Sequence, residues 1–309
     1  MNDLLVPRHH IYILLDSKAT KAAIEDAFMS HLVNNPSIQK GDAIIIYFAG
    51  HGSTAIAPDG WQNSNALRVE MLCPYDHGTR SRGGRIIGLT DWSVHAMLME
   101  LSESKGDNVT LILDCCFSPS PSHFGALSRA HTRWTPPGNK FTSDDLYAGL
   151  WRGALGRKVS FEGRGFYQNA INSHITVLAC SQGERAVEDK EGGRFTMGFL
   201  AATGTRLFHQ TSYDQLVGNL PFIAETNIRC ASARTRIVSS SVEPHLHPTL
   251  VMFLLSALAA MSVLSPVLYM EWWKVPNLAC TSITFMALQT LSLLLSKSSR
   301  CTQRGPYRR

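Results

Sequence analysis

Two reactive side chains follow two short apolar segments of this chain, and together they predict a thiol nucleophile with a base beside it. Residues 43–48 read AIIIYF and are followed by AGHG, in which the histidine is His51. Residues 109–113 read VTLIL and are followed by DCC, in which the second cysteine is Cys116. A histidine can take the proton of a thiol, and the resulting thiolate can attack a carbonyl carbon. The expected chemistry is therefore nucleophilic catalysis by Cys116, with His51 as acid and base.

The elements around these residues place both of them at one edge of a parallel sheet. Both apolar segments are rich in β-branched residues, as strands buried on two faces are. Residues 91–104 lie between them and carry apolar side chains at three- and four-residue steps, which predicts a helix capped by Thr90 or Asp91. A right-handed strand–helix–strand unit brings both strand ends to the same edge, where open α/β sheets place their sites. His51 and Cys116 are therefore expected to face one crevice.

These motifs resemble the paired histidine and cysteine signature of the caspase-like cysteine peptidases of family C14, and are most similar to the metacaspases of fungi and plants. The two signature sequences are YFAGHG at residues 47–52 and LDCCFS at residues 113–118. Other similar segments are HIYILLD at 10–16, LCPYD at 72–76, TVLAC at 176–180 and GRFT at 193–196. The resemblance covers roughly residues 5–230. It implies a three-layer α/β fold with a mainly parallel sheet and helices on both faces.

The resemblance also assigns roles to the residues around the nucleophile. It implies a cysteine endopeptidase that forms a thioester on Cys116, with His51 as acid and base. The backbone N–H groups of Gly52 and Cys116 would form the oxyanion hole. Asp114 would lie in the pocket for the side chain before the cleaved bond, where a carboxylate selects arginine or lysine. Cys115 would point away from Cys116 and into the core. The expected partners are proteins or peptides with a basic residue before the cut.

The resemblance leaves the metal and the activity open. Asp76 and Asp91 fall near positions that supply calcium ligands in some metacaspases, but calcium takes six or more oxygens and two carboxylates are few. The chemistry itself requires no cofactor, and calcium activation is an expectation to test. Two other functions also stay open. One is a catalytically inactive caspase-like binding module, held at a membrane by its tail, and the other is a different thiol enzyme, such as an amidase.

One element of the family pattern has no counterpart in this sequence. The family's first strand, an apolar run that ends in Gly-Ile-Asn, is missing, because the chain begins roughly where the second strand is expected. In caspase-like sheets the first strand lies between the second and the third, so its loss leaves two unpaired strand edges inside the sheet. It also removes the second acidic residue of the family's basic-residue pocket. The expected fold is a caspase-like sheet without its first strand.

The resemblance stops near Ser232, which implies a catalytic domain over residues 1–235 and a divergent tail over 236–309. The domain contains a long loop at 117–170 whose basic residues make it a candidate substrate of the enzyme itself. In the tail, residues 248–270 and 275–296 carry no charge and are each long enough to span a bilayer, which takes roughly 20 residues. A membrane hairpin is one interpretation of this tail. A translated intron or a shifted reading frame is the other.

Charge and cysteine content exclude some classes of partner and compartment. The net charge of +5 comes entirely from residues 246–309, and the rest of the chain is balanced. The catalytic domain therefore shows no basic footprint for nucleic acid. The 7 cysteines are odd in number and show no metal-ligand spacing, and no long apolar segment opens the sequence. These features predict a reduced, cytoplasmic protein, with membrane association through residues 248–296 as the alternative.

Overall fold

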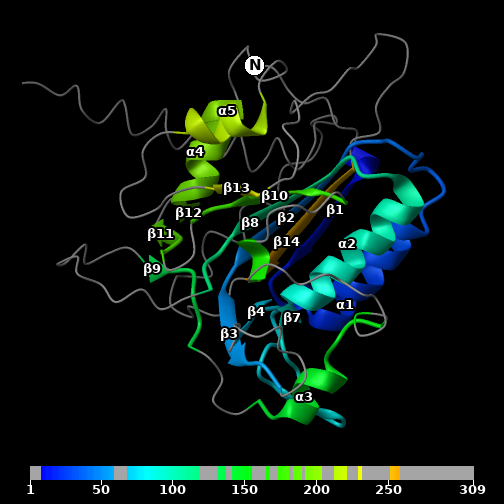
Figure 1. The fold of residues 1–309 in the computed structure, drawn as a ribbon, viewed down its shortest axis with the longest axis vertical. Helices are drawn as coiled ribbons and strands as arrows, with labels where there is room; N and C mark the ends of the chain where they lie inside the picture. The colour runs from blue at the N-terminus through cyan, green and yellow to red at the C-terminus, as the bar shows by residue number, and fades with distance from the viewer. Residues whose placement is uncertain are drawn as a thin grey trace, which may run out of the picture.

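A six-stranded sheet forms the centre of the molecule (Figure 1). The computed structural model describes residues 8–58, 68–117, 131–136, 141–152, 154, 165–167, 173–180, 184–189, 192–203, 212–220, 229–231 and 251–257. In spatial order the strands of the sheet are β1 (Ile11–Leu15), β14 (Val251–Ala257), β2 (Ile44–Gly50), β8 (Val109–Asp114), β10 (Ile175–Leu178) and β13 (Arg229–Ala231). All neighbours pair in parallel except β10 and β13. The mainly parallel sheet predicted from the sequence is therefore confirmed.

Helices cover both faces of this sheet and complete a three-layer fold (Figure 1). On one face, α1 (Lys21–Ala27), its π-helical continuation η3 (Phe28–Val33) and α2 (Asp91–Lys105) share a hydrophobic core with the sheet. On the other face, α4 (Arg194–Thr203) and α5 (Tyr213–Gly218) enclose a second core. These layers confirm the caspase-like α/β architecture that the resemblance implies.

The helix between the two site strands forms as its sequence predicts. The Thr90 hydroxyl accepts a hydrogen bond from the Ser93 N–H at 3.0 Å, which satisfies one of the free donors at the start of α2. The apolar stripe of α2 is buried, and Ala96 and Leu101 are fully inaccessible to solvent. Gly106 ends the helix with a φ of 92°, a conformation that glycine adopts without strain. This helix is the crossover that sets β2 and β8 side by side and in parallel.

The position of the missing first strand is filled from the other end of the chain. β14 lies between β1 and β2 and pairs in parallel with both, so that Leu254 is opposite Ile13 on one side and Tyr47 on the other (Figure 1). The backbone groups of β1 and β2 that face this position therefore have hydrogen-bonding partners. The family's sheet is completed without the family's own first strand.

This placement corrects the interpretation of the first apolar segment of the tail. The prediction of a membrane span over 248–270 is wrong for residues 251–257, because they form a strand of the central sheet. The remainder of that segment, and all of 275–296, lie outside the described residues. Within the residues that the structure describes, no helix is both long enough and apolar enough to cross a membrane.

Three small sheets and several short helices are the other elements of the described residues. β3 (Gly52–Ile56), β4 (Arg68–Leu72) and β7 (Leu89–Thr90) form an antiparallel sheet, and β5 (Arg80–Ser81) pairs with β6 (Gly84–Arg85). A third small sheet joins β9 (His131–Thr132), β11 (Val187–Asp189) and β12 (Gly192–Gly193). The remaining elements are α3 (Ser143–Ala148), η1 (Arg8–His10), η2 (Asp16–Lys18) and η4 (Gly165–Tyr167). The sheet of β9, β11 and β12 contributes directly to the site.

Candidate active site

The two chemical motifs leave the sheet side by side. β2 and β8 are adjacent parallel strands, with Ala49 opposite Asp114, so the residues that follow each strand meet at the same edge. The backbone N–H groups of Gly52 and Cys116 converge on one atom, the carbonyl oxygen of Arg133, and each donates to it at 3.1 Å. Two N–H groups that point at one carbonyl oxygen are the arrangement that stabilises an oxyanion.

Gly52 is held where only glycine fits. A Cβ atom at this position would overlap the carbonyl oxygen of Cys116 and would lie 2.8 Å from Cδ1 of Phe117. The absence of a side chain therefore lets the segment after β2 approach the segment after β8 closely. This close approach is what brings the two N–H groups to a common acceptor.

The Cys116 thiol is fully buried in this arrangement. Its Sγ donates to the carbonyl oxygen of Ala186 at 3.9 Å, and burial raises the pKa of the thiol to about 11. Cys115 belongs to the core on the α1–α2 side of the sheet, whereas Cys116 belongs to the core on the α4–α5 side. Successive residues of an extended chain point to opposite faces, which explains the separation.

His51 follows β2 at the same edge of the sheet at which Cys116 follows β8. Burial lowers the pKa of the imidazole, while Glu188 and a hydrogen bond to the Trp134 backbone act in the opposite direction. Nδ1 of His51 is buried without a hydrogen-bond partner, and among the described residues no hydrogen bond joins the ring to the Cys116 thiol. The described state therefore keeps the thiol protonated and the base disengaged.

The site is occupied by an extended segment of the same chain, residues 131–136. β9 pairs antiparallel with β11, with Thr132 opposite Val187. The N–H of Arg133 then donates to the carbonyl oxygen of Ala186 at 2.9 Å, and the N–H of Thr135 donates to the carbonyl oxygen of Gly52 at 2.9 Å. The segment is thus hydrogen-bonded along its backbone as an added strand, which is a common mode of peptide recognition.

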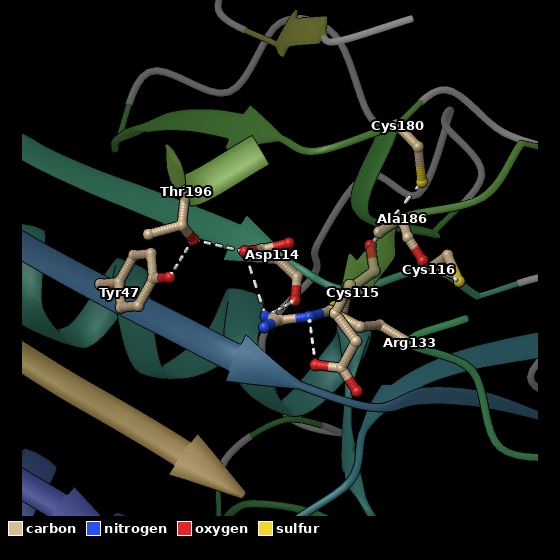
Figure 2. Close-up of polar contacts among 9 residues, drawn as sticks. Tyr47, Asp114, Cys115, Cys116, Arg133, Cys180, Ala186 and Thr196 are labelled. Atoms are coloured by element: carbon tan, nitrogen blue, oxygen red, sulfur yellow. Dashed lines mark hydrogen bonds and ion pairs between the residues drawn. The ribbon is translucent and has the colours of Figure 1, made fainter. Parts of the chain in front are cut away.

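The side chain of Arg133 lies between two carboxylates (Figure 2). Its NH1 is 3.0 Å from Oδ2 of the fully buried Asp114 and also donates to the Asp114 carbonyl oxygen at 3.0 Å. Its Nε is 3.1 Å from Oε2 of Glu188. A Cβ atom at Gly193 would overlap Oδ2 of Asp114 and lie 2.8 Å from Cζ of Arg133, so the absence of a side chain there makes room for the guanidinium. We call Asp114, Glu188 and Gly193 the arginine seat.

A hydrogen-bonded chain orients the carboxylate of the arginine seat. The Thr196 hydroxyl, on α4, donates to Oδ2 of Asp114, and the Tyr47 hydroxyl, on β2, is hydrogen-bonded to Thr196 (Figure 2). Burial raises the pKa of Asp114, while Arg133 and then the Thr196 hydroxyl lower it. These partners oppose the effect of burial on the pKa of Asp114, and the guanidinium is the strongest of them.

Several residues of the site escaped the sequence reasoning. Gly193 and Thr196 lie within the GRFT segment that resembles the family, which is the signal that could have identified them. Tyr47 belongs to the YFAGHG signature, in which only His51 and Gly52 have a predicted role. Glu188 carried no local signal, because its role depends on the pairing of β11 with β9.

The two suggested calcium ligands, Asp76 and Asp91, each accept a backbone hydrogen bond. Oδ1 of Asp76 accepts the Lys21 N–H at 2.9 Å. Asp91 is almost fully buried and accepts the Trp92 N–H at 3.0 Å, and burial followed by the nearby Glu70 raises its pKa well above the usual range. Among the described residues, no group of three or more His, Cys, Asp or Glu side chains is placed to hold a metal ion. Calcium binding through Asp76 and Asp91 stays a prediction.

Comparison with known proteins identifies the domain. Residues 8–122 match the family model described as the metacaspase, peptidase C14 domain, and this stretch includes both His51 and Cys116. The resemblance to the caspase-like peptidases is therefore confirmed for residues 8–122, which match a domain of a cysteine peptidase family. Within that family the matching model is the metacaspase one.

Two further comparisons add no functional information. A search of curated proteins gives no match. Among solved structures, the crystal structure of protein GSU0716 from Geobacter sulfurreducens aligns with 77% of this chain and 81% of its own, at 18% identity and a TM-score of 0.45. A likeness at that level carries no argument about this chain.

Proposed function

We propose that this protein is a cysteine endopeptidase that cleaves peptide bonds after basic residues, with Cys116 as nucleophile and His51 as acid and base. The observation that carries the proposal is the binding of Arg133 in its own chain. The carbonyl oxygen of Arg133 accepts both N–H groups of the expected oxyanion hole, while its guanidinium pairs with Asp114. Arg133 thus places its carbonyl oxygen in the expected oxyanion hole and its guanidinium in the arginine seat. The residue before a cleaved bond must occupy both places in the same way.

The occupied site supports a defined sequence of steps. Once His51 takes the Cys116 proton, the thiolate attacks the carbonyl carbon of the basic residue, and its oxygen gains negative charge between the N–H groups of Gly52 and Cys116. The carbon–nitrogen bond then breaks, and the imidazolium gives its proton to the leaving amine. Water hydrolyses the thioester, which releases a carboxylic acid and restores the thiol. These steps need no metal or cofactor.

The same geometry supports self-regulation. While residues 131–136 occupy the site, the thiol is buried with a pKa of about 11 and its oxyanion-hole donors are taken. A substrate must displace this segment, so the described arrangement is the resting form of the enzyme. Of the basic residues that the structure describes in the 117–170 loop, Arg133 is the one whose carbonyl oxygen accepts from the Cys116 N–H, and the Arg133–Trp134 bond is the proposed site of self-cleavage.

The test uses purified full-length protein and fluorogenic peptides that end in arginine, lysine or aspartate. We expect turnover of the two basic peptides and none of the aspartate peptide, and we expect Cys116→Ala to abolish it. The Arg133→Ala variant is assayed in parallel, so that self-occupancy cannot conceal activity. If both proteins turn over no more peptide than Cys116→Ala, the catalytically inactive binding module becomes the better account. Turnover of non-peptide amides alone would favour an amidase.

Calcium dependence and location are tested separately. Parallel assays with calcium and with a chelator decide whether the ion activates the enzyme. Cell fractionation, with an antibody against the catalytic domain, distinguishes a cytoplasmic protein from one held at a membrane. Release by alkaline carbonate would count against insertion through residues 258–309.

A further inference from the structure

Glu188 gives the arginine seat a second carboxylate, and we propose that this residue makes the enzyme select arginine over lysine before the cut. The inference rests on the proposed function, since Arg133 is taken as the stand-in for the substrate residue. Glu188 contacts the guanidinium at Nε, with Oε2 at 3.1 Å, whereas Asp114 contacts NH1 at the far end. The two carboxylates therefore recognise different atoms of one side chain.

The contact at Nε separates the two basic residues chemically. In lysine the atom that corresponds to Nε is a methylene carbon, and the positive charge lies one atom further along the side chain. A lysine ammonium could still reach Asp114, but it would present a C–H group to Glu188 and leave that carboxylate without its hydrogen bond. Asp114 therefore selects for positive charge, and Glu188 selects for the N–H that only arginine supplies at that position.

Glu188 is positioned by the strand that also binds the peptide backbone. It lies in β11, opposite His131 of β9, two residues beyond the Ala186 carbonyl that accepts the Arg133 N–H. Any peptide that adds to β11 in this register brings the side chain of its basic residue to Glu188. Only 20% of the Glu188 side chain is exposed, so its bond to the guanidinium is largely protected from water.

Glu188 also supplies the arginine seat with a second negative charge, from a different strand than Asp114. The carboxylate of Glu188 comes from β11, whereas Asp114 ends β8 and is hydrogen-bonded by Thr196 of α4. The arginine seat thus has two acids, one of which contacts Nε.

The first experiment measures kcat/KM for two peptides that differ only in arginine or lysine before the reporter group. It uses the full-length Arg133→Ala protein, in which the arginine seat is free. We expect a preference for arginine of about tenfold to a hundredfold, the value of a hydrogen bond to a charged group. Glu188→Ala should reduce the preference to within about threefold of unity by lowering arginine turnover. Glu188→Gln keeps a hydrogen-bond acceptor, so its preference for arginine should lie between those of the protein with Glu188 and of Glu188→Ala. The control Glu100→Gln, on α2, should leave the preference unchanged.

A second experiment tests the same contact without any turnover. In the Cys116→Ala protein, Arg133→Lys removes the Nε–H and should lower the melting temperature. In Cys116→Ala protein that also carries Glu188→Ala, the same Arg133→Lys change should cost much less. This cycle isolates the pair because each single change removes the same bond.

The outcomes separate the two proposals. Absence of turnover of both peptides overturns the proposed function, and the specificity of substrate cleavage falls with it. Strong arginine turnover with an unchanged ratio in Glu188→Ala and Glu188→Gln leaves the peptidase intact and overturns the role of Glu188. Equal effects of Arg133→Lys with and without Glu188 would also overturn it.

Discussion

Replacing Arg133 by alanine should turn the resting protein into a more active enzyme. The substitution removes the guanidinium from the arginine seat, so that residues 131–136 lose both ion pairs and keep their backbone hydrogen bonds and the packing of Trp134. It also leaves the fully buried Asp114 without its positive partner. Both effects favour release of the segment and entry of a basic substrate.

The size of the effect follows from the burial of this ion pair. Removing one partner of a buried, hydrogen-bonded charge pair costs about 3–5 kcal/mol. Each 1.4 kcal/mol is a factor of about ten, so the ratio of occupied to open sites should fall by about a hundredfold to a few thousandfold. Because the apparent affinity for a substrate scales with the open fraction, kcat/KM for an arginine peptide should rise at least about tenfold.

The assay compares Arg133→Ala with wild-type protein that intact-mass analysis shows to be uncut. Arg152→Ala is the matched control, because Arg152 lies in the same loop, is exposed and contacts Trp151 rather than the site. We expect no gain for the control. A folded Arg133→Ala protein that is no more active than wild type, or an equal gain for Arg152→Ala, would refute the self-occupancy argument.

Three further outcomes are expected. Gly193→Ala, made in Arg133→Ala protein, should lower kcat/KM for arginine peptides by about tenfold or more, because its Cβ takes the space of the guanidinium; unchanged kinetics would argue against the arginine seat. Leu254→Pro should lower the free energy of unfolding in urea by about 1–3 kcal/mol, because one backbone N–H of β14 is lost from the sheet. Leu254→Val should lower it far less. Equal stability of the two variants would contradict the placement of β14 in the sheet. In wild type, whose Cys116 thiol has a pKa of about 11, the rate of Cys116 alkylation should be low and should still rise with pH at pH 9. In Arg133→Ala the rate should be higher, because reduced burial lowers the pKa of the thiol. Identical pH profiles of alkylation, followed by mass spectrometry, would contradict this.

The core of the fold could be predicted from local patterns. β2, β8 and the helix between them each carry a continuous apolar run or a helical stripe, and Thr90 caps α2 as its position suggests. Such signals depend only on neighbours in sequence. Given these three elements, the handedness of the crossover is enough to bring His51 and Cys116 to one edge of the sheet.

The features that could not be predicted depend on long-range pairing. An uncharged apolar run over 248–270 fits a membrane span as well as a buried strand, because both remove the same side chains from water. Only the vacant position between β1 and β2 favours the strand. Likewise, nothing near Arg133 in sequence separates it from the other basic residues of its loop, since its partners on β8 and β11 are distant along the chain.

The most direct test of the account is covalent capture of the nucleophile. A peptide chloromethyl ketone that ends in arginine is incubated with wild-type and Arg133→Ala protein, and peptide mapping by mass spectrometry then locates the adduct. The account predicts modification of Cys116 and not of Cys115, faster in Arg133→Ala than in wild type, with little reaction of the matching aspartate reagent. Modification of Cys115, equal labelling by the aspartate reagent, or no adduct at Cys116 in either protein would contradict it.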